Sequence, residues 1–226
     1  MSKSGWYVEI KFKITLHNKD IGLLKLIQSY FGGVGNIKKD RTNYSVYSVN
    51  SLDHLLTEII PHFDKYPLIT QKLADYLLFK EVVMAVNRKE HLTAEGIQKI
   101  MNIRATLNHG LSPTLQEAFP NTIQVPRPIC DNPIIPDPEW MAGFTSGEGC
   151  FIVNIRKSQR TKQGSQIALT FSISQHSRDE KLMRSLVDYL GCGRYYPHSS
   201  RDMGELMCKT FQDNYEKIIP FLNTLY

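Results

Sequence analysis

The feature that most constrains this sequence is an internal repeat. The stretch VEIKFKITLHNKDIGLLKLIQSYFG, which starts at residue 8, matches IALTFSISQHSRDEKLMRSLVDYLG, which starts at residue 167, at a constant offset of 159. Under this offset Phe12 pairs with Phe171, and His17 pairs with His176. A repeated segment folds into a repeated structural unit, so we expect the 226 residues to contain two copies of one fold.

Each copy predicts a strand followed by a helix. Apolar and polar residues alternate at residues 8–15 and 166–174, as in a strand with one buried face and one polar face. Apolar residues then recur at helical spacing. We expect Asn18 and the Ser177 capping box to begin the two helices, and Gly32 and Gly191 to end them in the left-handed conformation. Two short strands follow in each copy.

The composition excludes several classes of protein. The apolar content of 42% is sufficient for a buried core, and a formal charge of +5 is only a mild attraction toward polyanions. The four cysteines show no CxxC pair and no zinc-like grouping with histidine, so we expect buried or free thiols in a reducing compartment. No apolar run approaches the roughly 20 residues that span a bilayer, and no signal-peptide core is present, so we expect a soluble, intracellular chain with no membrane partner.

Between the copies, three helical stretches are predicted near residues 51–61, 70–87 and 93–107. A proline-dense segment follows, which we interpret as an extended linker, since proline is excluded from helix interiors and central strands. The predicted organisation is an N-terminal half (1–110), a linker (111–136) and a C-terminal half (137–226).

The second half begins with an unusual helix. Asp137 is a good N-cap and Pro138 suits the first helical position. Each glycine in the helix interior costs about 1 kcal/mol in helix propensity, a cost that is tolerated where another backbone must approach closely. The sequence therefore predicts one half of a helix pair. The small residues of the predicted interface are Ala142, Gly143, Ser146 and Gly147.

Glu148 lies at the predicted end of this helix. The helix dipole disfavours a carboxylate there by roughly 0.3 to 1 kcal/mol, and a bound cation would reverse that effect. Two such helices side by side would bring two carboxylates to one point, an oxygen-rich site suited to Mg²⁺ and to phosphodiester chemistry. Taken alone, a glutamate at a helix end favours the interpretation of a solvated surface carboxylate. The small-residue face of this helix favours the metal site instead.

The segment WMAGFTSGEGCF resembles the LAGLIDADG motif of homing endonucleases, with residues 141–149 on its nine positions. HFDKYPLITQKLADYLLFK and LNHGLSPTLQEAFPNTI also look like single-chain, two-motif members encoded in organellar introns. This resemblance runs over essentially the whole chain. It implies an α+β fold of duplicated αββαββα units, whose two pseudo-twofold halves place antiparallel saddle sheets over double-stranded DNA. It also implies a monomer and a mitochondrial location.

The resemblance implies roles for individual residues. Glu148, with Gly147 beside it, would hold a divalent metal ion, Mg²⁺, that activates water. Lys72 would place a positive charge near the scissile phosphate, and Gln71 would orient water. The residues implied to contact DNA bases or phosphates are Lys11, Lys13, Lys38, Lys39, Arg41, Asn154, Arg156, Lys157, Ser158, Arg160, Lys162, Gln166, Thr170 and Ser172.

The sequence also departs from the family. The offset of 159 would place the first copy's counterpart of Glu148 before residue 1, and the counterpart of Lys72 beyond residue 226. We therefore expect a chain truncated at both ends, with weak or no double-strand cleavage by itself and with self-association through an unpaired edge strand. The functional hypotheses are a site-specific DNA endonuclease, an intron-encoded RNA maturase that assists splicing, and an inert remnant.

Overall fold

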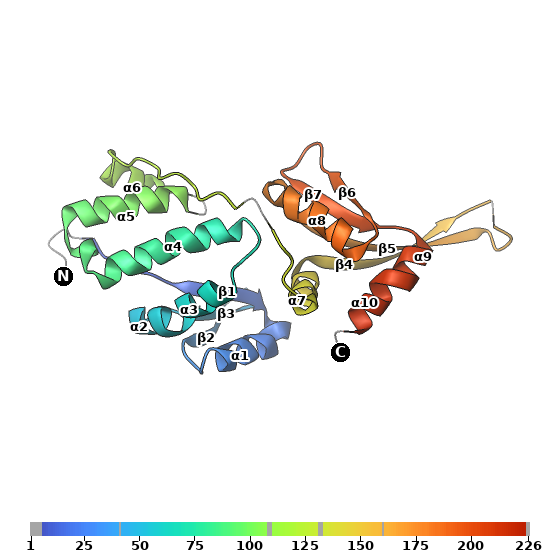
Figure 1. Cartoon of the computed structure of the whole chain (residues 1–226), viewed down its shortest axis with the longest axis horizontal. Coiled ribbons are helices and arrows are strands. Elements are labelled where there is room, and N and C mark those ends of the chain that lie inside the picture. The colour runs from blue at the N-terminus through green and yellow to red at the C-terminus, as the bar shows by residue number, and fades with distance from the viewer. Residues whose placement is uncertain (1–5, 41, 108–109, 131–132, 160, 225–226) are drawn as a thin grey trace. The chain divides into compact units, whose positions relative to one another are not determined.

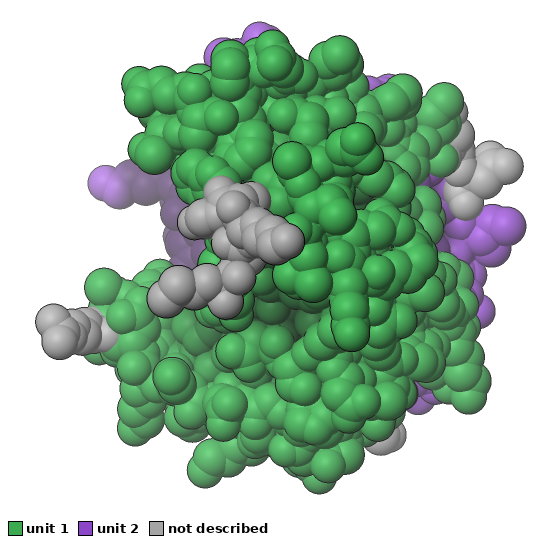
Figure 2. Space-filling model, turned by 90° about the vertical axis from the view of Figure 1, so that its left-hand side faces the viewer, with its two compact units in different colours: residues 1–68, 72–129 green, residues 69–71, 130–226 purple. Residues whose placement is uncertain are grey.

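The computed structural model describes residues 6–40, 42–107, 110–130, 133–159 and 161–224. The chain forms two compact units (Figure 2). Unit 1 comprises Met1–Leu68 and Lys72–Ile129, and unit 2 comprises Ile69–Gln71 and Cys130–Tyr226. No described helix is both long enough and apolar enough to cross a membrane.

Unit 1 is a three-stranded antiparallel sheet in the order β1-β3-β2, covered by helices (Figure 1). Tyr47 and Val49 of the sheet share one core with Leu24, Leu55 and Val83 of the helices. Its strands are β1 (Phe12–His17), β2 (Asn36–Lys39) and β3 (Tyr44–Val49). Its helices are α1 (Ile21–Tyr30), α2 (Leu52–His54), α3 (Ile60–Lys65), α4 (Lys72–Asn87), α5 (Ala94–Thr106) and α6 (Pro113–Ala118), with 3-10 turns at Asn18–Asp20 and Glu90–Leu92 and a π-helical turn at Leu55–Ile59.

Unit 2 is a four-stranded antiparallel sheet in the order β4-β5-β7-β6 (Figure 1). Its core contains Met141, Phe171, Met183, Leu186 and Leu206. The strands are β4 (Gly149–Lys157), β5 (Ser165–His176), β6 (Arg194–Pro197) and β7 (Met203–Cys208). The helices are α7 (Pro138–Glu148), α8 (Glu180–Leu190), α9 (Phe211–Asp213) and α10 (Ile219–Asn223), with a 3-10 turn at Ser177–Asp179 and a π-helical turn at Asn214–Ile218.

The two units repeat one another in register. Phe12 pairs with Val49 across β1 and β3, and Phe171 pairs with Cys208 across β5 and β7. Strand β7 and the second π-helical turn each lie 159 residues after their counterparts in unit 1. The duplication predicted from the sequence is therefore confirmed at the level of individual hydrogen-bonded pairs.

The helix caps predicted at Asn18 and Ser177 are wrong, because the N-cap residues of α1 and α8 are Asp20 and Asp179, without a side-chain cap hydrogen bond. Each helix is preceded by a 3-10 turn, so the residue that caps the turn lies one position earlier than we expected. His17 accepts a hydrogen bond from the Lys19 N–H at Nδ1, and His176 accepts one from the Arg178 N–H, both at 3.2 Å. The predicted left-handed ends are confirmed, since Gly32 and Gly191 have φ angles of +67° and +63°.

Strand β1 is shorter than the alternation predicts. It begins at Phe12, whereas apolar and polar residues alternate from Val8 onward. In unit 2, β4 pairs with β5 along Ser165–Ile173, and within the described residues no strand plays that part for β1. Alternation shows which side chains are buried, but a strand also requires a hydrogen-bonded neighbour.

The predicted linker at 111–136 is only partly extended. Ser112 and Pro113 supply a helix start, and α6 follows. Beyond it, the Ile123 N–H donates to Asn102 Oδ1 at 3.0 Å, and the Thr106 hydroxyl donates to the Val125 carbonyl at 2.8 Å. These contacts with α5 place the segment up to Ile129 in unit 1 rather than in a free linker.

Candidate active site and nucleic-acid interface

Helix α7 forms as the sequence predicts. Asp137 accepts a hydrogen bond from the Trp140 N–H at 2.6 Å, and Pro138 occupies the first turn. Met141 is 1% exposed and anchors the helix in the same core as Phe171 and Leu186. One face of α7 is therefore fixed to the unit 2 sheet.

The small-residue face of α7 is open. A Cβ atom added at Gly143 or Gly147 would meet no heavy atom within 4 Å. The Ser146 hydroxyl donates back to the Ala142 carbonyl at 2.8 Å, so it uses its hydrogen bond within the helix. The described residues of this chain thus present one half of the predicted helix pair and leave its seam uncovered.

Glu148 is the last residue of α7 and is exposed. Gly149 follows directly, donates its N–H to the Thr145 carbonyl and begins β4. A Cβ atom at Gly149 would lie 2.5 Å from that carbonyl oxygen, so this turn from helix to strand requires glycine. The geometry places the Glu148 carboxylate at the junction of the motif helix and the first strand of the sheet.

Among the described residues, no group of three or more His, Cys, Asp or Glu side chains that could hold a metal ion is found. Protein-bound Mg²⁺ usually uses one or two carboxylates and completes its shell with waters and substrate phosphate oxygens. A single exposed carboxylate such as Glu148 fits that mode of binding. It does not fit an all-protein metal site.

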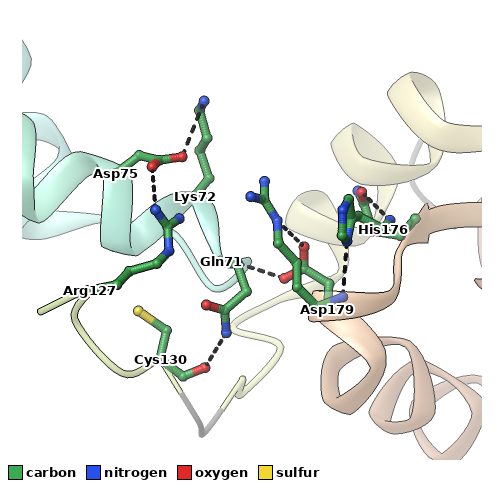
Figure 3. Close-up of polar contacts among 9 residues, drawn as sticks. Gln71, Lys72, Asp75, Arg127, Cys130, His176 and Asp179 are labelled. Atoms are coloured by element: carbon green, nitrogen blue, oxygen red, sulfur yellow. Dashed lines mark hydrogen bonds and ion pairs between the residues drawn. The ribbon is translucent and has the colours of Figure 1, made fainter. Parts of the chain in front are cut away.

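Lys72 is the first residue of α4, and its side chain is 59% exposed. Its Nζ lies 3.6 Å from Oδ2 of Asp75, one turn further along the helix. Asp75 is 8% exposed at its side chain, and Oδ1 accepts from Arg127 at 2.9 Å (Figure 3). Neither Asp75 nor Arg127 is among the functional residues predicted from the sequence. The spacing of three residues between Lys72 and Asp75 was the available signal for the first of them.

Gln71 is hydrogen-bonded to other residues of unit 2 (Figure 3). Its backbone N–H donates to Oδ1 of Asp179 at 2.6 Å, and its side-chain amide donates to the Cys130 carbonyl at 3.0 Å. The Gln71 side chain therefore binds the backbone carbonyl of Cys130. The role of Gln71 in orienting water stays a prediction.

The polar face predicted for the second copy exists on β4 and β5. Arg156 pairs with Gln166, Asn154 with Ala168, and Ile152 with Thr170, so these side chains share one face. Arg156 and Gln166 are exposed, whereas Asn154 and Thr170 are half-buried.

Ser172 requires a correction. It belongs to the same face, but it is only 2% exposed, so it does not present a surface for DNA in this structure. The reason is its place in the middle of the sheet, where Cys150 of β4 and Met207 of β7 flank it on both sides. The alternation of apolar and polar residues along β5 predicts the face on which Ser172 lies. It does not show which strands lie beside β5.

Unit 1 carries a comparable face. Lys13 and Asn36 both pair with Ser48 of β3, and Lys38 pairs with Val46, so both lysines lie on one side of the sheet, where they are exposed. Lys11 is exposed and lies 2.9 Å from Glu9. Of the remaining predicted contacts, Lys39, Lys157 and Lys162 are exposed, Ser158 is half-buried, and Arg41 and Arg160 lie outside the described residues.

A family model described as LAGLIDADG endonuclease matches residues 1–83 and 141–226, which include both repeats and α7 from Met141 onward. The chain belongs to the LAGLIDADG endonuclease family. The family resemblance inferred from residues 141–149 is therefore confirmed.

Relatives of this LAGLIDADG protein are named as intron-encoded proteins. Probable intron-encoded endonuclease 3 of Neurospora crassa is 41% identical over 227 residues, covering 98% of this chain and 42% of the relative. Probable intron-encoded endonuclease 2 of the same organism is 39% identical over 232 residues, covering 98% of this chain and 50% of the relative. The chain thus spans half the length of these relatives or less. An uncharacterized protein in ND4 intron 1 of Podospora anserina is 44% identical over 93 residues, 40% of this chain and 20% of that protein.

Solved structures of the homing endonuclease I-SmaMI are similar over nearly the whole chain. The complex with cleaved DNA has a TM-score of 0.96 and 46% identity, and the match covers 99% of this chain and 74% of that chain. I-SmaMI bound to uncleaved target DNA in the presence of calcium ions matches with the same TM-score and identity, covering 99% and 76%. The predicted LAGLIDADG homing-endonuclease fold is confirmed.

Proposed function

We propose that this chain acts in a site-specific DNA endonuclease of the homing type, which cuts both strands of a long target in a metal-dependent reaction. The observation that carries the proposal is the junction at Gly149. There the exposed carboxylate of Glu148 directly precedes the strand that bears Asn154 and Arg156 on an accessible polar face. One short segment therefore joins a cleavage group to a surface able to contact DNA.

The chain's own residues have distinct parts in this proposal. Glu148 would be the protein ligand of the metal ion, proposed to be Mg²⁺, which when bound activates water and stabilises the leaving oxygen. Lys72 would place its ammonium group near the phosphate, where charge develops as the bond breaks. The Lys72 ammonium lies 3.6 Å from Oδ2 of Asp75, and this ion pair orients the lysine side chain while leaving it exposed.

The proposal is tested by incubating the purified chain with a plasmid that carries the intron-free insertion site of its host gene, with Mg²⁺ present. Because the described residues supply one motif helix and one motif carboxylate, we expect nicked circles and little linear product. A chain that does not nick this plasmid, or that nicks a plasmid with the intron inserted at the same rate, would contradict the proposal.

The strand faces predict a measurable loss of affinity. Replacing Arg156 by alanine removes an exposed cation on the β4 face, and we expect target binding to weaken by about 1 to 3 kcal/mol if it contacts a base. If it contacts a phosphate instead, binding to all DNA should weaken equally and the salt slope should fall by about one. Lys25→Ala, an exposed lysine on helix α1, is the matched control, and binding isotherms at several salt concentrations distinguish the two outcomes.

We further propose that the chain self-associates through β1. Within the described residues, β1 pairs with β3 alone, so its other edge offers unpaired backbone groups. Sedimentation velocity at increasing concentration should show a growing dimer fraction. A monomer at all concentrations would contradict this proposal.

We infer that the chain is encoded in an organellar intron and located in the mitochondrion, because the relatives carry names of intron-encoded proteins and one lies in an ND4 intron. The maturase alternative is not favoured, since the two Neurospora relatives are named as endonucleases.

A further inference from the structure

Asp179 is a buried carboxylate with an unusual partner. It is 6% exposed and ends the 3-10 turn that leads into α8. Its Oδ1 accepts a hydrogen bond of 2.6 Å from the backbone N–H of Gln71, which is 108 residues away in the sequence. Its Oδ2 lies 3.9 Å from Nε of Arg178. A buried carboxylate is stable only when its oxygens are satisfied, so the Gln71 amide is part of what allows Asp179 to be buried.

The segment that donates this bond is a short strap, Ile69–Gln71. These three residues belong to unit 2, although Leu68 before them and Lys72 after them belong to unit 1. Ile69 packs against the apolar core of unit 2, and the Gln71 side chain donates to the Cys130 carbonyl at 3.0 Å. The Ile69 packing and the two Gln71 hydrogen bonds therefore help to hold the strap on unit 2.

The repeat shows that the turn itself does not require a buried carboxylate. Asp20 is the counterpart of Asp179, and it ends the corresponding 3-10 turn, Asn18–Asp20. Asp20 is exposed. Since the turn, its histidine cap and its aspartate are shared, the difference in burial reflects the strap that covers Asp179.

We propose that Asp179 is a positioning residue for Lys72. This inference rests on the proposed function, in which Lys72 provides charge near the phosphate. Lys72 follows Gln71 by one peptide bond and is the first residue of α4, so fixing the Gln71 amide fixes the point from which the lysine side chain projects (Figure 3). A misplacement of about 1 Å at a group of this kind is enough to cost roughly a hundredfold in rate.

The first test measures the strap directly by amide hydrogen exchange. In Asp179→Ala we expect the Gln71 amide to exchange at least tenfold faster than in the native chain, because its acceptor is gone. Asp179→Asn keeps a carbonyl oxygen at the same place and should retain most of the protection. Asp20→Ala is the matched control and should leave Gln71 unchanged. Unaltered exchange in the β7 amides establishes that unit 2 remains folded in each variant.

The second test measures nicking of the target plasmid. We expect Asp179→Ala to lower kcat at least tenfold with KM and DNA affinity unchanged, and Asp179→Asn to restore most of the rate. Equal Gln71 exchange in the native chain and Asp179→Ala, or an equal fall in kcat in Asp20→Ala, would overturn the positioning role. A native chain that nicks no DNA would overturn the proposed function and with it the catalytic consequence, while hydrogen exchange would still decide whether Asp179 holds the strap.

Discussion

Replacing Glu148 by glutamine is expected to reduce strand cleavage by roughly a hundredfold or more, with DNA affinity nearly unchanged. The substitution preserves the size of the side chain and removes the negative charge at the exposed end of α7. A neutral amide binds a divalent cation far more weakly than a carboxylate, so the metal-activated water would be lost. The measurement is the rate of nicked-circle formation with saturating plasmid and Mg²⁺, together with a binding isotherm.

The same helix provides the control for this prediction. Glu139 is also exposed but lies in the first turn of α7, at the opposite end from Gly149. Glu139→Gln makes the same chemical change, and we expect cleavage within about twofold of the native rate, because its site is distant from the proposed chemistry by about 13 Å at 1.5 Å per residue. Equal loss in both variants would mean that general charge on α7, not the carboxylate at its end, controls cleavage.

Much of the fold could be predicted because it depends on periodic patterns. Alternation gave the buried faces of β1 and β5, helical spacing gave α1 and α8, and the repeat required that the second unit copy the first. The motif helix was predictable down to its cap, since Asp137 and Pro138 are local signals whose effect needs no tertiary contact.

What sequence could not give depends on contacts between distant segments. Ser172 has the right alternation for a surface residue and is buried by strands on both sides. Asp179 and Asp20 end equivalent 3-10 turns, yet only Asp179 is buried, under residues 69–71. The start of β1 at Phe12 likewise follows from which neighbour it pairs with. No local pattern encodes these facts.

The repeat also predicts an asymmetry in stability. Phe171 and Phe12 occupy equivalent positions, but Phe171 is 2% exposed in the core that also holds Met141 of α7. Phe12 is half-buried and lines an open apolar groove with Tyr30 and His62. We expect Phe171→Ala to lower the free energy of unfolding of unit 2 by about 3 to 5 kcal/mol. Phe12→Ala should cost unit 1 less, by at least about 1 kcal/mol, because part of the ring already faces water.

The two tryptophans allow the two losses to be measured separately. Trp6 lies in unit 1 and Trp140 in unit 2, so Trp140→Phe and Trp6→Phe leave a fluorophore in one unit at a time. Urea unfolding followed by fluorescence then gives a free energy for each unit, with and without the phenylalanine substitution. An equal loss of unfolding free energy in Phe12→Ala and Phe171→Ala would show that Phe12 is as well buried in solution as Phe171 is in the core of unit 2. That result would contradict the open groove in unit 1.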